Sequence, residues 1–193
     1  MKTRKTQYPV DSVFVNRWSP RAISPEMMND AELMSLFEAA RWAPSSYNNQ
    51  PWRFIYAKRG TDFWKTFYDL LVPFNQEWAK TTSYLVVILS RKNFEYNEKP
   101  SRTHSFDTGA AWENLALQAS MMGVVAHGIE GFDYEKARKE LNIPDNYAIE
   151  AMIAIGKHGN KEDLPPELQE REELSDRKKV KEFIFEGRFK GKK

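Results

Sequence analysis

The sequence predicts a layered domain of the α+β or α/β class, in which helices cover a central sheet. Helical and strand patterns alternate along most of the 193 residues, as they do in layered domains. Residues 84–89 are a continuous apolar run bounded by polar residues, which is typical of a central strand buried on both faces. Because no Gly-x-Gly-x-x-Gly motif follows a strand, a dinucleotide-binding Rossmann fold is disfavoured.

The composition indicates a folded domain and excludes several classes of protein. Hydrophobic residues make up 41% of the chain and charged residues 29%, which fits one domain with a substantial core. The absence of cysteine excludes disulfides, thiol catalysis and zinc–thiolate sites. The net charge of +2 is too small to favour nucleic-acid binding. No membrane helix or signal peptide is visible, so we expect a cytoplasmic protein.

The element boundaries follow from apolar spacing and from residues that start or stop helices. Apolar residues recur at helical spacing between Leu33 and Ala40, with a capping signal at Asn29 and a stop at Pro44. Gly123 is expected to end a later helix. The expected elements are, in chain order, helix 30–42, strand 52–57, helices 62–71 and 73–81, strand 84–89, helix 107–122, strand 124–129, helix 134–141 and strand 148–155.

The segment between the first long helix and the first strand carries the clearest signal for function. Residues 43–52 read Ala-Pro-Ser-Ser-Tyr-Asn-Asn-Gln-Pro-Trp. Two prolines bracket a run of hydroxyl and amide side chains, which offers many hydrogen-bond donors and acceptors on a stiff connector. On composition alone, an ordinary helix-to-strand loop is the better interpretation.

A second candidate segment is Arg17-Trp18-Ser19-Pro20-Arg21, in which two arginines flank a serine. If residues 16–19 end a short helix or turn, both guanidinium groups can converge on one anion. A phosphate suits such planar groups with several donors. The same pattern, taken alone, also fits two surface arginines near a turn.

Together these segments resemble the nitroreductase-like family of flavoproteins. The family signature Ala-Pro-Ser-Ser-x-Asn-x-Gln-Pro-Trp matches residues 43–52 at every fixed position, and an Arg-x-Ser-x-Arg/Lys element stands in the same place before the first long helix. The Gly-Ile-Glu-Gly-Phe-Asp segment at 128–133 and the basic segment at 174–179 resemble two further family elements. The resemblance extends over about residues 14–190, with these segments in the family's order.

The resemblance implies a three-layer α-β-α sandwich with a mixed central sheet, and a domain-exchanged homodimer with two FMN sites at its interface. It implies a single domain over residues 1–193, with a basic N-terminal tail at about 1–10 and a C-terminal arm at about 157–193. FMN would be the cofactor, NADH or NADPH the reductant, and a nitroaromatic, quinone or similar small molecule the electron acceptor. Since the flavin does the chemistry, we expect no catalytic side chain and no metal site.

By resemblance, the FMN-binding residues come from separate parts of the chain. Residues 17–21 and Arg177 would hold the phosphate, and residues 44–50 of the partner subunit would cover the other side. Asn75 would meet the pyrimidine edge of the flavin, and a backbone N–H at 130–131 would point at flavin N5. The full expected set is Arg17, Trp18, Ser19, Arg21, Pro44, Ser45, Ser46, Asn48, Gln50, Asn75, Ile129, Glu130, Gly131 and Arg177.

Two positions depart from the family pattern. Many relatives carry a lysine one turn after the asparagine, near flavin N1–O2, where this sequence has Trp78. Gly128 stands where relatives often have proline. Residues 91–104, which are polar and charged, are interpreted as an exposed loop or lid.

Other functions stay open at this level. Some family members dehalogenate, oxidise peptide-derived heterocycles or cleave flavin, and the sequence does not separate these activities. A protein that binds or sequesters flavin without useful turnover is a second class. A nucleotide- or nucleic-acid-binding module built on the basic ends is a third. An absorbance spectrum followed by an anaerobic NAD(P)H titration distinguishes them.

Overall fold

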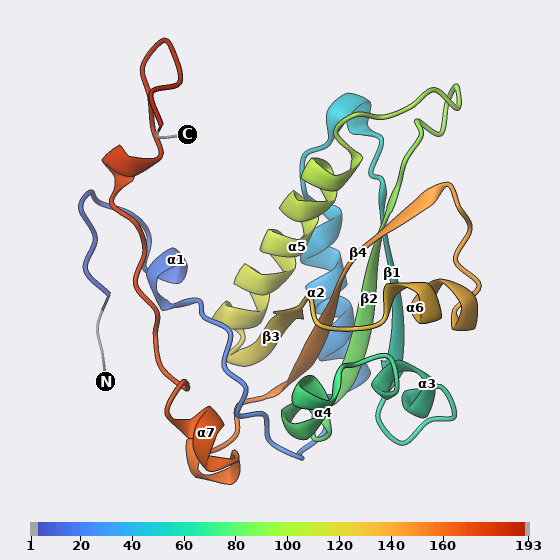
Figure 1. Cartoon of the computed structure of the whole chain (residues 1–193), viewed down its shortest axis with the longest axis vertical. Helices are drawn as coiled ribbons and strands as arrows, with labels where there is room; N and C mark the ends of the chain where they lie inside the picture. The colour runs from blue at the N-terminus through green and yellow to red at the C-terminus, as the bar shows by residue number, and fades with distance from the viewer. Residues whose placement is uncertain (1–3, 192–193) are drawn as a thin grey trace.

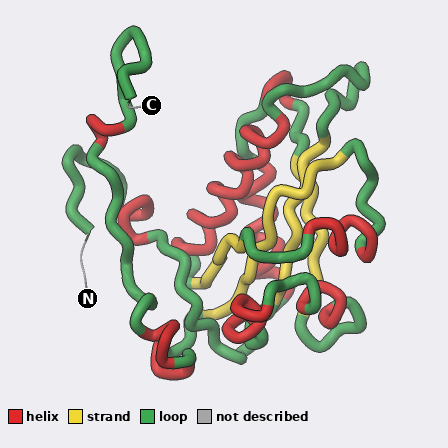
Figure 2. The backbone as a smooth tube through the Cα atoms, in the orientation of Figure 1, coloured by secondary structure: helices red, strands yellow, loops and turns green. Residues whose placement is uncertain are grey.

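A computed structural model describes residues 4–191; residues 1–3 of the expected tail and 192–193 of the expected arm lie outside the described part. A four-stranded sheet forms the middle layer, and helices cover both of its faces (Figures 1 and 2). In chain order the elements are α1 (Ser12–Asn16), α2 (Asp30–Arg41), η1 (Ser46–Asn48), β1 (Trp52–Lys58), α3 (Trp64–Tyr68), α4 (Pro73–Ala79), β2 (Tyr84–Arg91), α5 (His104–Met121), β3 (Val124–Ile129), α6 (Tyr134–Glu140), β4 (Tyr147–Lys157), η2 (Lys161–Asp163), α7 (Pro166–Gln169) and η3 (Val180–Glu182).

The sheet has the strand order β1-β2-β4-β3, and every neighbouring pair is antiparallel. The predicted mixed sheet is therefore wrong for the described residues. The helices between β1 and β2 and between β3 and β4 have only 5 to 7 residues, which is about 8–11 Å of helix. Such short connectors return the chain at the end of the sheet where it left. α5, with 18 residues, is long enough to cross the sheet, and it joins β2 to β3, which are not neighbours.

The side chains of β2 divide the apolar core between the two faces of the sheet. Val86 and Ile88 pack in the cluster with α2 and α5, whereas Leu85, Val87 and Leu89 pack in the cluster with α3, α4 and α6. Successive side chains of a strand point to opposite faces, so both faces of β2 are covered. Every β2 residue except the last is buried. The predicted doubly buried central strand and the three-layer α-β-α sandwich are confirmed.

The predicted strands and the two long helices are confirmed, with boundaries shifted by up to three residues. The predicted helix 62–71 is shorter in the structure, where α3 spans Trp64–Tyr68, and the predicted helix 73–81 ends as α4 at Ala79. α2 begins after Asn29, which forms a capping box with Glu32. α5 begins at His104, ahead of the predicted Asp107, and the Asp107 carboxylate instead accepts a hydrogen bond from the backbone N–H of Ser46 at 3.0 Å. A carboxylate in the first turn of a helix is stabilised by the helix dipole, so Asp107 fits this position.

The N- and C-terminal segments lie side by side, apart from the sheet (Figure 1). The Arg4 side chain connects them, because it donates hydrogen bonds to the carbonyl oxygens of Val15, Arg17 and Ser175 at 2.9, 2.8 and 2.8 Å. Both segments are mainly loop (Figure 2). Their exposed large apolar side chains include Tyr8, Val10, Phe14, Phe183, Ile184 and Phe189.

The loop after α1 is held against the end of β4. The backbone N–H of Gly159 donates to the carbonyl of Ala22 at 2.9 Å, and Ile23 forms a β-bridge with His158. A Cβ atom on Gly159 would lie 2.8 Å from backbone atoms of Ile23 and Ser24. The two backbones can approach this closely only because Gly159 has no side chain.

We expect Gly159→Ala to lower the free energy of unfolding by about 1–3 kcal/mol, because an added methyl group overpacks the contact with the loop after α1. Urea denaturation measures the change. Gly109→Ala is the matched control, since nothing lies within 4 Å of a Cβ at this position in α5. The control should be neutral or up to about 1 kcal/mol more stable, because alanine favours helix. Equal stability of Gly159→Ala and wild type would contradict the close approach.

Candidate functional site

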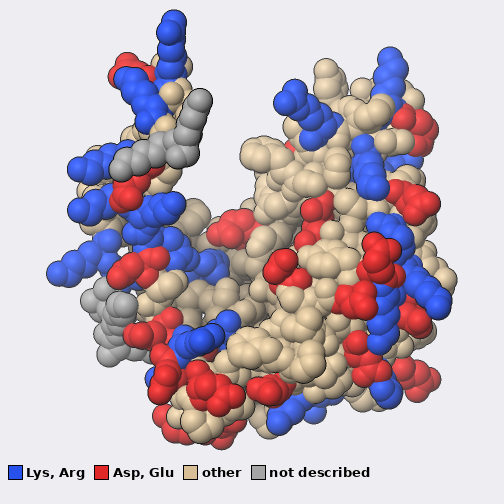
Figure 3. All heavy atoms as spheres, viewed as in Figure 1, with Lys and Arg blue, Asp and Glu red and all other residues tan. Residues whose placement is uncertain are grey.

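Basic side chains from separate parts of the chain line a cavity of about 290 Å³, here called the arginine cavity. The loop after α1, strand β3 and the C-terminal segment all contribute to it. Figure 3 shows that Lys and Arg side chains also gather over the terminal segments nearby. The lining residues are Arg4, Arg17, Trp18, Ser19, Arg21, His127, Arg171, Glu173, Ser175 and Arg177.

Positive charge in the arginine cavity is only partly balanced. The Nε of Arg17 lies 4.0 Å from the Glu113 carboxylate, which is a long ion pair. Burial and then the Arg177 and Arg17 charges lower the pKa of Arg4. The Nε of Arg21 is buried without a hydrogen-bond partner among the described residues. Since a buried unpaired donor costs about 1–3 kcal/mol, this set of groups favours an anion with several acceptor oxygens.

A buried carboxylate fixes the backbone of the arginine cavity. Glu172 is 7% exposed, and it accepts hydrogen bonds from the backbone N–H of Arg21 at 2.7 and 3.0 Å and of Ala22 at 2.8 Å. Because the carboxylate is occupied by backbone groups, the Arg21 guanidinium stays available for an anion. Sequence reasoning missed Glu172, because it lies 151 residues from Arg21 within a charged segment that has no motif.

His127 on β3 forms the inner side of the arginine cavity as a neutral imidazole. Its Nδ1–H donates to the carbonyl of Pro20 at 2.9 Å, and its ring centroid lies 4.6 Å from that of Trp78. Burial lowers the pKa of His127 to about 4, and the Arg21 charge acts in the same direction. Hydrogen bonds to the carbonyls of Pro20 and Ser19 oppose this shift without overcoming it. The ring is therefore uncharged near pH 7.

Asn75 and Gly131 lie together on the other side of Trp78. The Nδ2 of Asn75 donates to the carbonyl of Gly131 at 2.9 Å, and the indole N–H of Trp78 donates to Asn75 Oδ1 at 3.2 Å. A Cβ atom on Gly131 would lie 2.8 Å from Asn75 Nδ2, so a glycine permits this contact. The expected residues Ile129 and Glu130 directly precede Gly131 at the end of β3. Trp78, which is expected at the position of the family lysine, is 3% exposed and orients Asn75.

Residues 44–50 lie beside the start of α5 in a strained conformation. Tyr47, Asn48 and Gln50 have positive φ angles of 52°, 51° and 47°, which cost a non-glycine residue on the order of 1–2 kcal/mol each. Local hydrogen bonds hold this shape, among them the bond from the backbone N–H of Gln50 to the Ser45 hydroxyl at 3.0 Å. Strain of this kind is concentrated at functional sites.

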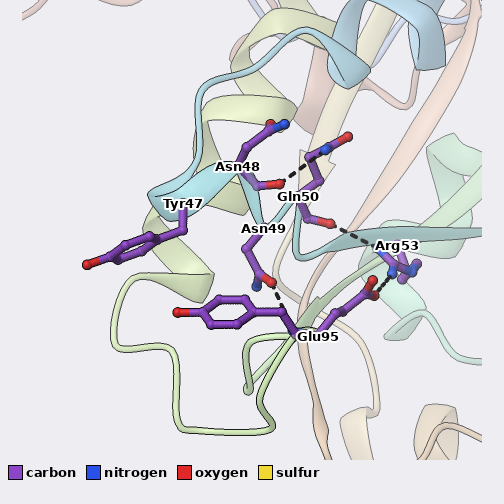
Figure 4. A pocket seen from close by; sticks show the side chains of 7 residues that line it. Tyr47, Asn48, Asn49, Gln50, Arg53 and Glu95 are labelled. Atoms are coloured by element: carbon purple, nitrogen blue, oxygen red, sulfur yellow. Dashed lines mark hydrogen bonds and ion pairs between the residues drawn. The ribbon is translucent and has the colours of Figure 1, made fainter.

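A second cavity of about 370 Å³ opens beside residues 44–50 (Figure 4). Among its lining residues are the expected Asn48 and Gln50, together with Arg53 and Glu95. The loop after β2 contributes Glu95, which places residues 91–104 next to the motif segment.

One chain keeps the two groups of expected residues apart. Ser46 contacts Asp107 in the first turn of α5, whereas Trp18 lines a small cavity with Ala116 and Ser120 further along the same helix. Nine to thirteen residues of helix correspond to about 14–20 Å. Residues 17–21, Asn75 and 129–131 are connected through His127 and Trp78, and Arg177 lines the same arginine cavity. Pro44, Ser45, Ser46, Asn48 and Gln50 form a separate group.

No helix among residues 4–191 is long and apolar enough to cross a membrane. Within the same residues, no group of three or more His, Asp or Glu side chains is placed to hold a metal ion.

Comparison with known proteins identifies the family of this chain. The model of the nitroreductase family matches residues 15–71 and 65–157. The chain belongs to the nitroreductase family. The protein DrgA of Synechocystis sp. is 30% identical over 185 residues, which cover 80% of this chain and 85% of DrgA. A protein of Archaeoglobus fulgidus with the provisional name NADH dehydrogenase/NAD(P)H nitroreductase is 27% identical over 152 residues, which cover 77% of this chain and 84% of that protein.

Solved structures of the nitroreductase family show the same fold. A crystal structure of an oxidoreductase containing FMN has a TM-score of 0.93 and 46% identity, and the match covers 98% of this chain and 97% of that chain. A nitroreductase family protein from Clostridium difficile 630 has a TM-score of 0.68 and 18% identity, with 92% and 97% covered. The predicted nitroreductase-like fold is confirmed, and the roles of individual site residues stay predictions.

The neutral His127 predicts that stability falls in acid. The pKa is about 4 in the folded protein against the ordinary 6.5, so the unfolded chain binds more protons between these pH values. The free energy of unfolding therefore decreases as the pH falls from 6.5 towards 4, by up to about 3 kcal/mol. Urea unfolding at pH 7 and at about pH 4.5 measures this decrease.

His127→Gln should remove this component, because glutamine can still donate to Pro20 and does not ionise. His104→Gln, at the start of α5, is the control that should keep the pH dependence of the wild type. An identical pH dependence in His127→Gln and wild type would show that His127 is not the group responsible.

Proposed function

We propose that this protein is a homodimeric oxidoreductase that takes hydride from NADH or NADPH and passes it through FMN to a nitroaromatic, quinone or similar small oxidant. As a member of its family, the chain is an FMN-dependent NAD(P)H oxidoreductase. The observation that carries the finer proposal is the arginine cavity, whose residue His127 packs on Trp78, which in turn donates a hydrogen bond to Asn75 beside Gly131.

The described residues fit FMN at both ends of this chain of contacts. At one end, Arg17, Arg21 and Arg177 bring several guanidinium groups together, and the unpartnered Arg21 Nε is a donor that a terminal phosphate would satisfy. At the other end, Gly131 lets Asn75 pack against the backbone, and the Asn75 amide can both donate to and accept from a polar ring edge. The chain has no glycine-rich loop for a pyrophosphate, which favours FMN over FAD.

FMN, when bound, supplies the hydride chemistry at N5. The chain binds and orients it: Arg17, Ser19, Arg21 and Arg177 would hold the phosphate, with Trp18 beside them. A backbone N–H at 130–131 would stabilise negative charge near N5. Because Trp78 carries no charge, stabilisation of negative charge at the opposite ring edge depends on neutral donors and not on a lysine.

In the proposed dimer, residues 44–50 of each subunit complete the site of the other. One chain places them beside the start of α5, away from the arginine cavity. Figure 3 shows a hollow between the terminal segments and the rest of the molecule, and those segments expose the large apolar side chains named above. A second copy that fills this hollow would bury them. We propose that residues from about 157 onward act as the arm of a single domain, and that the protein works in the cytoplasm, where NAD(P)H is available.

The decisive experiment is an absorbance spectrum followed by an anaerobic titration with NADH and NADPH. We expect a yellow protein that bleaches with one or both reductants and regains its colour on addition of menadione. A colourless protein after reconstitution with FMN would overturn the proposal. A yellow protein that neither reductant bleaches would instead be a flavin-binding protein without turnover.

The shared site predicts an FMN-loaded dimer in solution. Light scattering should give about twice the chain mass of 22.6 kDa. A stable monomer that retains FMN would contradict a site completed by the partner subunit.

Arg21→Ala should weaken FMN binding on the order of 10- to 100-fold, because a charge-assisted bond to phosphate contributes about 1.5–3 kcal/mol. Arg21→Lys should recover part of the affinity, since it keeps the charge but loses the planar donors. Flavin fluorescence titration of the apoprotein measures the affinity, and stopped-flow reduction at saturating FMN should be nearly unchanged. Arg102→Ala, an exposed arginine in the loop before α5, is the control. An unchanged FMN affinity in Arg21→Ala would show that Arg21 does not bind the phosphate.

A further inference from the structure

Tyr47, Phe94 and Tyr96 form an aromatic cluster at the edge of the second cavity. The ring centroids of Tyr47 and Phe94 are 5.7 Å apart, those of Phe94 and Tyr96 5.5 Å, and those of Tyr47 and Tyr96 6.3 Å. Tyr47 precedes β1 and the other two follow β2, so two loops supply the cluster. Tyr47 is 81% exposed and Tyr96 is 65% exposed.

The position of Tyr47 is not explained by folding. Its φ angle of 52° is in the left-handed region, where a bulky residue is rare and glycine or asparagine is tolerated. Its ring is largely exposed, so little apolar burial offsets the backbone strain. A role for the ring at the surface is the simpler explanation for a tyrosine here.

Hydrogen bonds and ion pairs hold the loop after β2 in place. Glu95 forms ion pairs with Arg53 and with Arg91, the latter at 3.2 Å. The backbone N–H of Glu95 donates to Asn49 Oδ1 at 3.0 Å, which joins this loop to the motif segment. Tyr96 is therefore held near Tyr47 without being buried. An exposed ring that is already in position loses less conformational freedom when a ligand binds.

The second cavity also contains Asn48 and Gln50, which the proposed function places at FMN. Figure 4 shows the Tyr47 ring pointing away from the Arg53–Glu95 ion pair, so its face is not covered by these charged groups. Tyrosine rings have electron-rich faces that stack on flat rings. We infer that Tyr47 and Tyr96 form the aromatic contact surface for the flat, electron-poor ring of the electron acceptor. This inference rests on the proposed function, whose acceptor class it connects to named residues.

The nicotinamide ring of the reductant is also flat and must reach the flavin, so the experiment distinguishes a contact with the acceptor from a contact with NAD(P)H. In steady-state assays of the holoenzyme, menadione and nitrobenzene are varied at saturating NAD(P)H, and NAD(P)H is varied at saturating menadione. Tyr47→Asn and Tyr96→Leu should each raise the KM for both acceptors roughly 3- to 10-fold, as expected for loss of an aromatic stacking contact. The kcat and the KM for NAD(P)H should change less than about twofold.

Two further variants test the chemistry of the contact. Tyr96→Phe keeps the ring and should have the same KM values as the wild type. A raised acceptor KM in this variant would instead indicate a role for the hydroxyl. Phe63→Leu is the control, because Phe63 is also largely exposed, at 70%, but follows the far end of β1. Tyr47→Asn should unfold at a temperature no lower than that of the wild type, because asparagine tolerates positive φ. A lower midpoint would overturn the interpretation of Tyr47.

Unchanged acceptor KM values in both Tyr47→Asn and Tyr96→Leu would overturn the inference, and so would an increase confined to the KM for NAD(P)H. FMN content and anaerobic reduction by NAD(P)H are measured on the same preparations. A wild-type protein that lacks FMN or is not reduced would overturn the proposed function together with this inference. Normal FMN content and reduction with unchanged acceptor KM values would overturn the inference alone.

Discussion

The close packing of the loop after α1 against the end of β4 is the constraint on which the arginine cavity depends. Gly159 permits the backbone contact, and Glu172 uses its buried carboxylate to hold the N–H groups of Arg21 and Ala22. A carboxylate at this depth would normally pair with a cation. Because it binds backbone donors instead, it does not take up the buried Nε of Arg21, which has no hydrogen-bond partner among the described residues.

Charged and neutral side chains occupy different parts of the site, and this arrangement suits FMN. The arginines gather at one end, while the neutral His127 and Trp78 separate them from the amide of Asn75 and the backbone of Gly131. A dianionic phosphate needs the first environment, and a flat ring with neutral polar edges needs the second. The nitroreductase family relationship and this gradient of charge therefore support the same cofactor from independent directions.

The separation of residues 44–50 from the arginine cavity has a physical origin in α5. This helix of 18 residues is long enough to keep the two groups at different points along its length. No rearrangement of a short loop would bring them together in one chain. In the proposed dimer, sharing the site between two copies would keep both halves on well-packed elements, and it would give the exposed apolar side chains of the terminal segments a surface to cover.

The sequence by itself determined the elements and the family, because apolar spacing, capping residues and the motif at 43–52 are local features. Only the family resemblance gave Arg17 and Arg21 a shared phosphate; the structure has both in one cavity, and their role there stays a prediction. The antiparallel order of the sheet, the hydrogen bonds of Glu172 and the pairing of Tyr47 with Tyr96 were decided by the tertiary structure. Each of these depends on packing between segments far apart in the chain, 151 residues in the case of Glu172 and Arg21, and no local pattern carries that information.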